Sequence, residues 1–341
     1  MPPPPSPLLL VLDGNSLLHR AYHAAATGRL LDNDDRPVWA IKGLIGYVAR
    51  AAARLRPEAV VVGFDCAVKS ARRVVYPGYK AHRPEKPTDL TEQIAAAPEL
   101  LSAAGITTVT HTAYEADDVL ASSAEHARGS GWRSILMTSD RDAFALIDST
   151  TSVLRVRNGG FDQAVIVTPD ALADLYGVQP AQYRDYAALR GDPSDNLHGI
   201  RGFGSATAAR LLATFGSVDD AWAVWDRGDE EAIRAIVGAR TAANFGAPDA
   251  RDTVDRNRRL MAMRADLPIP GLDAARLPLD LGVMKRAFAH RGIMLGPSLW
   301  ALTGGSPPPE DEDVTRVPRQ WEPRPRGRRR WDPTPGQLAL F

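Results

Sequence analysis

The chain has 341 residues, 44% of them hydrophobic, and its 41 Lys and Arg residues balance 41 Asp and Glu residues, so it can bury a sizeable core and form two domains. Its single cysteine, Cys66, excludes an internal disulfide framework and fits a reducing compartment. No apolar run approaches the length of a membrane span, and the opening MPPPPSP lacks the charged region of a signal peptide, so we expect a soluble intracellular protein with no membrane partner.

Three short apolar runs, at residues 8–12, 59–64 and 134–139, each stop at an aspartate. Runs of this length without alternation are typical of strands buried on both faces of a parallel sheet. Helical patterns lie between them and begin at Trp39, Thr88 and Glu115. The alternation of strands and helices predicts an α/β fold with a mainly parallel central sheet flanked by helices.

The strand pattern ends at about residue 168, which predicts three regions. Residues 1–168 form the α/β domain, and residues 169–302 form a helical module punctuated by glycine. From Thr303 onward, Pro, Arg and acidic residues dominate, and such a composition cannot bury enough apolar surface to fold. We therefore expect residues 303–341 to be a disordered tail.

Acidic residues gather where the predicted strands end. The group consists of Asp13, Asp65, Glu115, Asp117, Asp118, Asp140 and Asp142. Any one of them is best explained as a helix cap. Because sites in parallel sheets form at the carboxyl ends of the strands, however, all seven should converge. Packed carboxylates repel one another, so such a group needs cations.

Oxygen ligands without Cys or His favour Mg²⁺ or Mn²⁺ over zinc. Two such ions a few Å apart activate water against a phosphodiester. The carboxylates thus indicate a metal-dependent phosphoryl hydrolase. In this interpretation His19, His23 and His82 pack or touch DNA rather than act as acid or base, and Cys66 is a small buried residue.

The segment at residues 69–86 is strongly basic although the whole chain is neutral. Its cations are Lys69, Arg72, Arg73, Lys80, Arg83 and Lys86, with Tyr76 and Tyr79 interleaved. Such a stretch can neutralise phosphates while its rings stack on bases. A solvated surface loop is the alternative. The position just after Asp65 favours a nucleic-acid contact beside the carboxylates.

Residues 189–212 contain three glycines before a predicted helix that starts near Ser205. The spacing of Gly199, Gly202 and Gly204 resembles helix–hairpin–helix elements, which bind a DNA backbone through main-chain N–H groups at a helix start. Upstream, Asp192 and Asp195 add two carboxylates that can share a helical face.

Six motifs together carry a resemblance to a known family. They are LDGNSLLHRAYHA, GFD, YPGYKAHRP, YEADDVL, TSDRDAFALI and GDPSDNLHGIRGFGSATA, in this order. They resemble the bacterial 5′-nucleases: the N-terminal domain of DNA polymerase I, stand-alone 5′–3′ exonucleases and flap endonucleases. The match runs from about residue 8 to about residue 290, and we expect a stand-alone member because no polymerase domain follows.

The resemblance implies a PIN-like nuclease domain with a C-terminal helix-three-turn-helix module that binds duplex DNA. It also implies a role for each acid. Asp13, Asp65, Glu115, Asp117 and Asp118 match ligands around a first divalent cation, Mg²⁺ or Mn²⁺. Asp140, Asp142, Asp192 and Asp195 match those around a second.

The same resemblance implies the contacts to DNA. Lys80, Arg83 and Arg20 match catalytic positions near the scissile phosphate. Arg72 and Tyr79 match a helical arch, here around residues 69–90, through which a 5′ end threads. Gly199, Gly202, Gly204 and Ser205 match the hairpin that binds the downstream duplex, in the family often with K⁺.

We therefore expect a monomeric, metal-dependent, structure-specific 5′–3′ exonuclease and flap endonuclease, acting on DNA with a free 5′ end or flap in the cytoplasm, at the nucleoid. Two alternatives come from other classes: a PIN-type ribonuclease and a non-catalytic DNA-binding scaffold. The first typically lacks the arch and hairpin, and the second typically lacks some of the acids.

The chain ends in QLALF, residues 337–341. Gln337, Leu338, Leu340 and Phe341 match a short bacterial motif that binds the sliding clamp of the replicase. A flexible tail suits such a peptide, because the anchor must reach its partner while the enzyme works on DNA. The alternative is an apolar end that folds back on the core.

Overall fold

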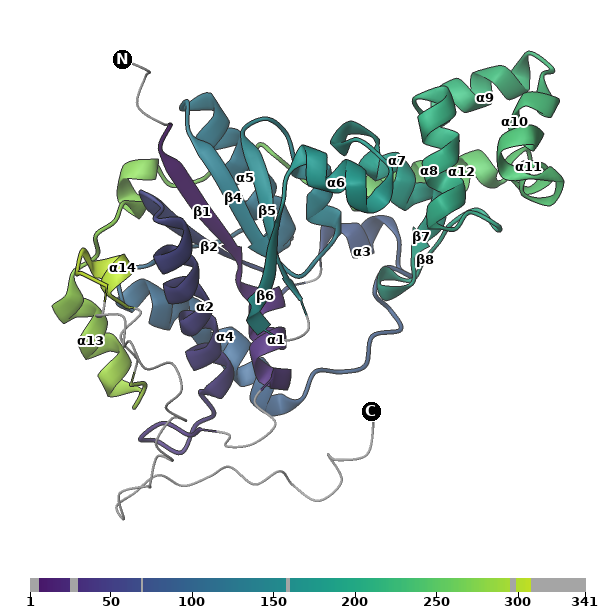
Figure 1. Cartoon of the computed structure of the whole chain (residues 1–341). Coiled ribbons are helices and arrows are strands. Elements are labelled where there is room, and N and C mark those ends of the chain that lie inside the picture. The colour runs from purple at the N-terminus through teal and green to yellow at the C-terminus, as the bar shows by residue number, and fades with distance from the viewer. Residues whose placement is uncertain (1–5, 25–29, 69, 158–159, 295–298, 308–341) are drawn as a thin grey trace, which may run out of the picture. The chain divides into compact units, whose positions relative to one another are not determined.

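The computed structural model describes residues 6–24, 30–68, 70–157, 160–294 and 299–307 (Figure 1). Within it the chain divides into two compact units, each built from three stretches. Unit 1 comprises Met1–Asp13, Gly63–Glu85 and Val109–Pro270, and unit 2 comprises Gly14–Val62, Lys86–Thr108 and Gly271–Phe341.

The described residues contain a six-stranded sheet with the order β3-β2-β1-β4-β5-β6. Its strands are β1 (Leu8–Asp13), β2 (Ala59–Phe64), β3 (Thr107–Thr110), β4 (Arg133–Thr138), β5 (Thr151–Arg157) and β6 (Gly160–Val167). In unit 1, β4 pairs in parallel with β1 and with β5, whereas β6 pairs antiparallel with β5. The predicted α/β fold with a mainly parallel sheet is confirmed.

Burial explains which strands could be predicted. Every residue of β1 and of β2 is buried, as expected for apolar runs inside a parallel sheet. Strand β6 instead mixes buried and exposed residues: Phe161, Ala164 and Val167 are buried, whereas Val165 is 37% exposed. Strands β3, β5 and β6 carry polar residues within short runs, and for this reason the sequence analysis missed them.

Unit 1 also holds most of the helices. They are α3 (Ala71–Val75), α5 (Ala116–Gly129), α6 (Pro169–Tyr176), α7 (Pro180–Arg190), α8 (Ser205–Phe215), α9 (Val218–Asp226), α10 (Glu230–Val237), α11 (Ala239–Phe245) and α12 (Ala250–Met261), with the 3₁₀ turns η1 (Asp142–Leu146) and η2 (Pro193–Asp195) and the short strands β7 (Gly191–Asp192) and β8 (Leu197–His198). Helix α5 packs on β1 and β4, and α7 contacts η1, α8 and α12. The helical character predicted after residue 168 is confirmed (Figure 1).

An aromatic cluster joins η1 to helices α6 and α7. The ring of Phe144 lies 5.6 Å from that of Tyr176 and 5.4 Å from that of Tyr183. Tyr186 extends the cluster, 5.6 Å from Tyr183. Because α7 leads directly into β7, this packing fixes the start of η1, at Asp142, relative to the turn that follows α7.

Unit 2 is built from α1 (Gly14–Ala24), α2 (Trp39–Leu55), α4 (Thr88–Ala103), η3 (Leu272–Ala275), α13 (Leu281–His290) and α14 (Trp300–Thr303). Helices α2 and α4 begin where the sequence predicted. Helix α2 contacts α1, α4 and α14, and the Tyr22 hydroxyl donates to Asp89 at 2.9 Å inside this packing. None of the described helices is both long and apolar enough to cross a bilayer.

Asp148 caps the turn before β5. Its Oδ1 accepts hydrogen bonds from Thr150 N–H at 2.7 Å and Thr151 N–H at 2.8 Å, and Oδ2 lies 2.7 Å from Arg128 Nη2. Partial burial opposes ionisation, but the hydrogen bonds from Thr150 and Thr151 and the charge of Arg128 outweigh it, so the pKa of Asp148 is lowered.

Replacing Asp148 with Asn is expected to lower the free energy of unfolding at pH 7 by about 1 kcal/mol, since the charge-assisted hydrogen bonds weaken and the exposed Arg128 pair adds little. Because the folded-state pKa lies below the ordinary 3.8, this contribution is complete above pH 3.8 and is lost as the pH falls through the folded value. Urea denaturation at several pH values measures the difference, with the exposed Asp162→Asn as control. If the difference in unfolding free energy between wild type and variant grew as the pH fell, this account would be contradicted.

Candidate active site

Carboxylates at two strand ends of unit 1 are held by one threonine. The Thr138 hydroxyl donates to Asp13 Oδ2 at 2.8 Å and accepts from the Asp140 N–H at 3.0 Å. Asp140 Oδ1 in turn accepts from the Asp142 N–H at 3.0 Å, which starts η1. Asp13 is buried at 5% exposure. A run of short hydrogen bonds therefore brings three predicted site residues to one edge of the sheet.

The start of α5 adds the next carboxylates. Glu115 is the N-cap of this helix and forms a capping box with Asp118. Asp65, which follows β2, accepts from the Ala116 N–H at 2.8 Å through Oδ1. The positive end of the helix thus stabilises acids from two segments.

Asp117 differs from these acids because its Oδ1 is buried and has no hydrogen-bond partner among the described residues. Burial raises its pKa well above the ordinary value, and the charges of Asp140 and Asp13 raise it further. A buried carboxylate oxygen without a donor is costly unless a proton or a cation compensates it.

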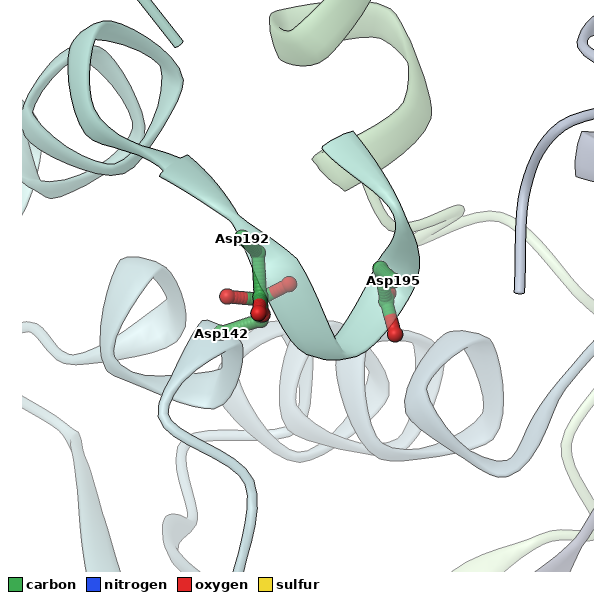
Figure 2. A group of neighbouring side chains, drawn as sticks. All are labelled: Asp142, Asp192 and Asp195. Atoms are coloured by element: carbon green, nitrogen blue, oxygen red, sulfur yellow. The ribbon is translucent and has the colours of Figure 1, made fainter. Parts of the chain in front are cut away.

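Asp142, Asp192 and Asp195 form a second group, with one ligand atom of each lying within 4.8 Å of the others. Figure 2 shows Asp142 and Asp192 coming together from η1 and β7, with Asp195 on the same turn as Asp192. Burial raises the pKa of Asp142, and the charges of Asp140 and Asp192 add to it. This group is within reach of a single cation.

The donor chemistry of both groups fits a divalent metal ion. The orphaned oxygen of Asp117 and the convergent oxygens of Asp142, Asp192 and Asp195 are all carboxylate oxygens, which hard cations prefer. Such an ion also removes the repulsion that raises the pKa values of Asp117 and Asp142. The described acids can therefore hold divalent metal.

Glu115 is in a different electrostatic environment. Lys80 Nζ lies 2.8 Å from its Oε2, and the buried Tyr79 hydroxyl donates to the same oxygen at 3.3 Å. Burial alone would raise the pKa of Glu115, but the charges of Lys80 and Arg72 outweigh burial and lower it. Glu115 is therefore stabilised as a carboxylate by the protein's own cations.

The basic segment contains one short helix, α3, and then docks on the turn at residues 192–196. Lys80 N–H donates to the Asp195 carbonyl at 3.0 Å, in a left-handed conformation with φ of 53° at Lys80. Arg83 donates to the Ser194 carbonyl at 3.0 Å and to Asp195 Oδ1 at 2.7 Å. Asn196 Nδ2 donates to the Gly78 carbonyl at 2.8 Å. The segment is thus fixed beside the second carboxylate group.

Two residues of the predicted DNA-contacting set, Tyr79 and Arg72, have positions that bear on their roles. Tyr79 is only 3% exposed, so its ring offers no free face to a base, and Arg72 is turned inward against Asp118. Arg20 belongs to α1 in unit 2, and its place near a scissile phosphate stays a prediction. Lys69 lies outside the described residues.

The predicted glycine hairpin is compact because a side chain would not fit at two of its positions. A Cβ on Gly199 would lie 2.2 Å from the Arg190 carbonyl carbon. Gly202 has a φ of 96°, and a Cβ there would lie 2.6 Å from Thr241 Oγ1. Gly202, Gly204 and Ser205 are exposed, so the start of α8 presents main-chain N–H groups to solvent.

Two supporting residues escaped the sequence analysis. Asn257 on α12 is fully buried, and its Nδ2 donates to the carbonyls of Ala188 at 3.0 Å and His198 at 2.9 Å, which ties α12 to the hairpin. Thr138 joins Asp13 to Asp140, as described above. Its signal was visible, since a hydroxyl residue ends an apolar strand two residues before Asp140. Asn257 gave no comparable signal inside an arginine-rich helix.

Comparison with family models gives two matches that adjoin. One is described as "5′-3′ exonuclease, N-terminal resolvase-like domain" and matches residues 8–177. The other is described as "5′-3′ exonuclease, C-terminal SAM fold" and matches residues 178–279. Together they cover most of the chain. The domain boundary at residue 168 stays a prediction.

The curated relatives include DNA polymerases. DNA polymerase I of Mycobacterium leprae is 36% identical over 284 residues, which are 83% of this chain and 30% of that protein. The thermostable DNA polymerase I of Thermus thermophilus is 34% identical over 288 residues, 84% of this chain and 32% of that protein. The chain therefore spans about a third of the length of these relatives.

Solved structures share the fold. The flap endonuclease of bacteriophage T5, in a pseudo-enzyme-product complex with DNA and metal ions, has a TM-score of 0.59 at 18% identity and covers 74% of this chain and 88% of its own. The catalytic core of Rad2 in complex with a DNA substrate has a TM-score of 0.51 at 16% identity, with coverages of 85% and 88%.

Adding Mn²⁺ or Mg²⁺ to chelator-treated protein is expected to raise its melting temperature, because a ligand that binds only the folded state at 100 times its Kd adds about 2.7 kcal/mol. Asp142→Asn removes one member of the second group and should reduce this rise. Differential scanning fluorimetry across a metal titration measures it, and Asp174→Asn, at an exposed acid of α6, is the matched control. Equal shifts in both variants would remove Asp142 from the metal site.

Proposed function

Because the chain belongs to the 5′-3′ exonuclease family, we propose that it hydrolyses DNA phosphodiesters near free 5′ ends, including 5′ flaps, with the help of divalent metal ions. The observation that carries this proposal is the convergence of carboxylates beside Lys80 and Arg83 in unit 1. Removal of primers and flaps from chromosomal DNA in the cytoplasm, at the nucleoid, suits this activity, since the relatives are DNA polymerases.

Mg²⁺ or Mn²⁺ is the metal that we propose. Asp13, Asp65, Glu115 and Asp117 would surround one ion, and Asp140, Asp142, Asp192 and Asp195 a second. Bound there, the ions supply an activated water and neutralise charge on the scissile phosphate. The support is the donor set itself, because every candidate ligand is a carboxylate and one oxygen of Asp117 has no hydrogen-bond partner in the described part of the chain.

Lys80 and Arg83 are proposed to bring positive charge to the phosphate. Lys80 lies 2.8 Å from Glu115, and Arg83 lies 2.7 Å from Asp195 in the second group. Neither side chain is fully buried. Positive groups fixed where negative charge develops lower the barrier of phosphoryl transfer. Arg20 is proposed to act at the same phosphate, on the strength of its motif alone.

The exposed hairpin is proposed to bind the downstream duplex through its backbone. Gly202, Gly204 and Ser205 are exposed around the start of α8. Free main-chain N–H groups of the first helical turn could contact a phosphate there, and main-chain carbonyls could hold a bridging K⁺; neither contact needs base recognition. Binding there would place a 5′ end by the structure of the DNA rather than by its sequence. We propose that the chain acts as a monomer.

A labelled 5′-flap DNA tests this function. The wild-type chain should cleave it with Mg²⁺ and leave it intact with chelator. Asp140→Asn should slow cleavage by roughly 10³-fold, since the metal supplies several kcal/mol of charge stabilisation, while flap DNA is still retained in a gel shift. Asp174→Asn is the matched control and should cleave like wild type.

Intact flap at stoichiometric wild-type enzyme with Mg²⁺ would refute the nuclease proposal and favour a scaffold. Faster cleavage of an RNA strand without a flap would favour the ribonuclease alternative. Wild-type turnover by Asp140→Asn would remove that residue from the metal site without touching the rest of the proposal.

We also propose that the terminal peptide, Gln337, Leu338, Leu340 and Phe341, binds a sliding clamp; these residues lie outside the described part of the chain. Its support is the sequence QLALF at the end of a Pro- and Arg-rich stretch. Deleting residues 337–341 is expected to abolish binding to the purified clamp in surface plasmon resonance and to leave flap cleavage intact, because the anchor and the site are separate. Unchanged clamp affinity, or a lower melting temperature, would favour an end that folds back on the core.

A further inference from the structure

Arg72 is a largely buried arginine whose hydrogen bonds point into the protein. Its side chain is 11% exposed. Nη1 and Nη2 each donate to an oxygen of Asp118 at 2.8 Å, in a bidentate pair. Nε donates to the Leu260 carbonyl at 2.8 Å and Nη2 to the Ala262 carbonyl at 3.0 Å. These bonds use four of the five guanidinium N–H donors, which leaves too few for the bidentate contact that arginine makes to a phosphate.

The Asp118 carboxylate is likewise hydrogen-bonded within the protein. Its side chain is 1% exposed, and each carboxylate oxygen accepts a second hydrogen bond besides the one from Arg72. Oδ1 accepts from the Arg264 N–H at 2.9 Å, and Oδ2 accepts from the Glu115 N–H at 3.0 Å. With two donors on each oxygen, the carboxylate has no lone pair left for a metal ion.

The pair joins three segments of unit 1. Arg72 lies on α3 and Asp118 lies in the first turn of α5. The main-chain groups that they bond, at residues 260–264, lie at the end of α12 and just after it. Glu115 and Asp117 are on the same turn of α5, so the pair fixes the turn from which both project. The Asp118–Glu115 capping bond extends this support directly to Glu115.

We propose that Arg72 and Asp118 form a positioning pair that sets the metal-binding geometry of Glu115 and Asp117, and that neither residue contacts the metal ion or the DNA. This inference rests on the proposed function, because it assigns a role toward the metal site of that function. It replaces the sequence-based interpretation of Asp118 as a ligand and of Arg72 as a contact of the arch.

Charge alone makes the opposite prediction for metal binding, which gives the test its direction. Arg72 Nη1 lies 3.6 Å from Glu115 Oε2. Removing this cation would strengthen the attraction of the carboxylates for a divalent ion if nothing moved. A positioning role instead predicts that its removal weakens metal binding, since residues that orient ligands change metal affinity by about 10- to 100-fold.

The test measures Mn²⁺ affinity of the full chain by electron paramagnetic resonance of the free ion, without DNA. Arg72→Gln, Asp118→Asn and the double variant should each bind Mn²⁺ roughly 10-fold more weakly than wild type, with no further loss in the double variant. Arg72→Lys keeps the positive charge but loses the planar guanidinium that makes the bidentate contact, so it should show most of the loss in Mn²⁺ affinity. This variant replaces Arg72→Gln in the test if Arg72→Gln does not fold. Arg73→Gln, at the exposed neighbour on α3, is the matched control.

Affinity for 5′-flap DNA in chelator separates the pair from a DNA contact. Arg72→Lys and Asp118→Asn should bind it within about twofold of wild type, because no phosphate contact is lost. Tighter or unchanged Mn²⁺ binding, additive losses in the double variant, or a tenfold drop in DNA affinity for Arg72→Lys would each overturn the proposal. Absence of flap cleavage by wild type would refute the proposed function instead, and the Mn²⁺ and DNA measurements would still decide the role of the pair.

Discussion

Mutual repulsion between carboxylates is the constraint on which the site in unit 1 depends. The sheet and α5 bring acids from distant segments to one edge, where burial makes their charges costly. The chain compensates some of them itself: Asp65 receives a main-chain N–H at the start of α5, and Glu115 receives Lys80. It leaves Asp117 and Asp142 without enough positive charge, which is the condition under which a cation is needed.

Adjacent acids in the YEADDVL motif have opposite environments. Asp117 has a buried oxygen with no partner among the described residues, whereas Asp118 accepts four hydrogen bonds. Consecutive positions on a helix point about 100° apart, so one faces the carboxylate edge and the other faces Arg72. The motif therefore combines a residue suited to binding a cation with one suited to holding the helix in place.

Much of the fold was predictable because it depends on apolar runs and capping residues. Strands β1 and β2 follow from continuous apolar sequence and the start of α2 from a helical pattern, whereas β6 mixes buried and exposed residues and was missed. The gathering of acids followed from parallel strand ends. The sequence did not predict which acids are neutralised within the protein, because Asp118 and Glu115 receive hydrogen bonds from Arg72 and Tyr79, which lie far away in the sequence. Residue type predicted charge, but only the packing determines which charges are paired.

The docking of the basic segment on the turn at 192–196 relies largely on main-chain groups. The amide of Lys80 meets the carbonyl of Asp195, the Arg83 side chain meets the carbonyl of Ser194, and Asn196 meets the carbonyl of Gly78. A carbonyl is present whatever side chain its residue carries. The exposed side chains between these anchors can therefore change without loss of these carbonyl acceptors, and the basic segment stays in register with the carboxylates beside it.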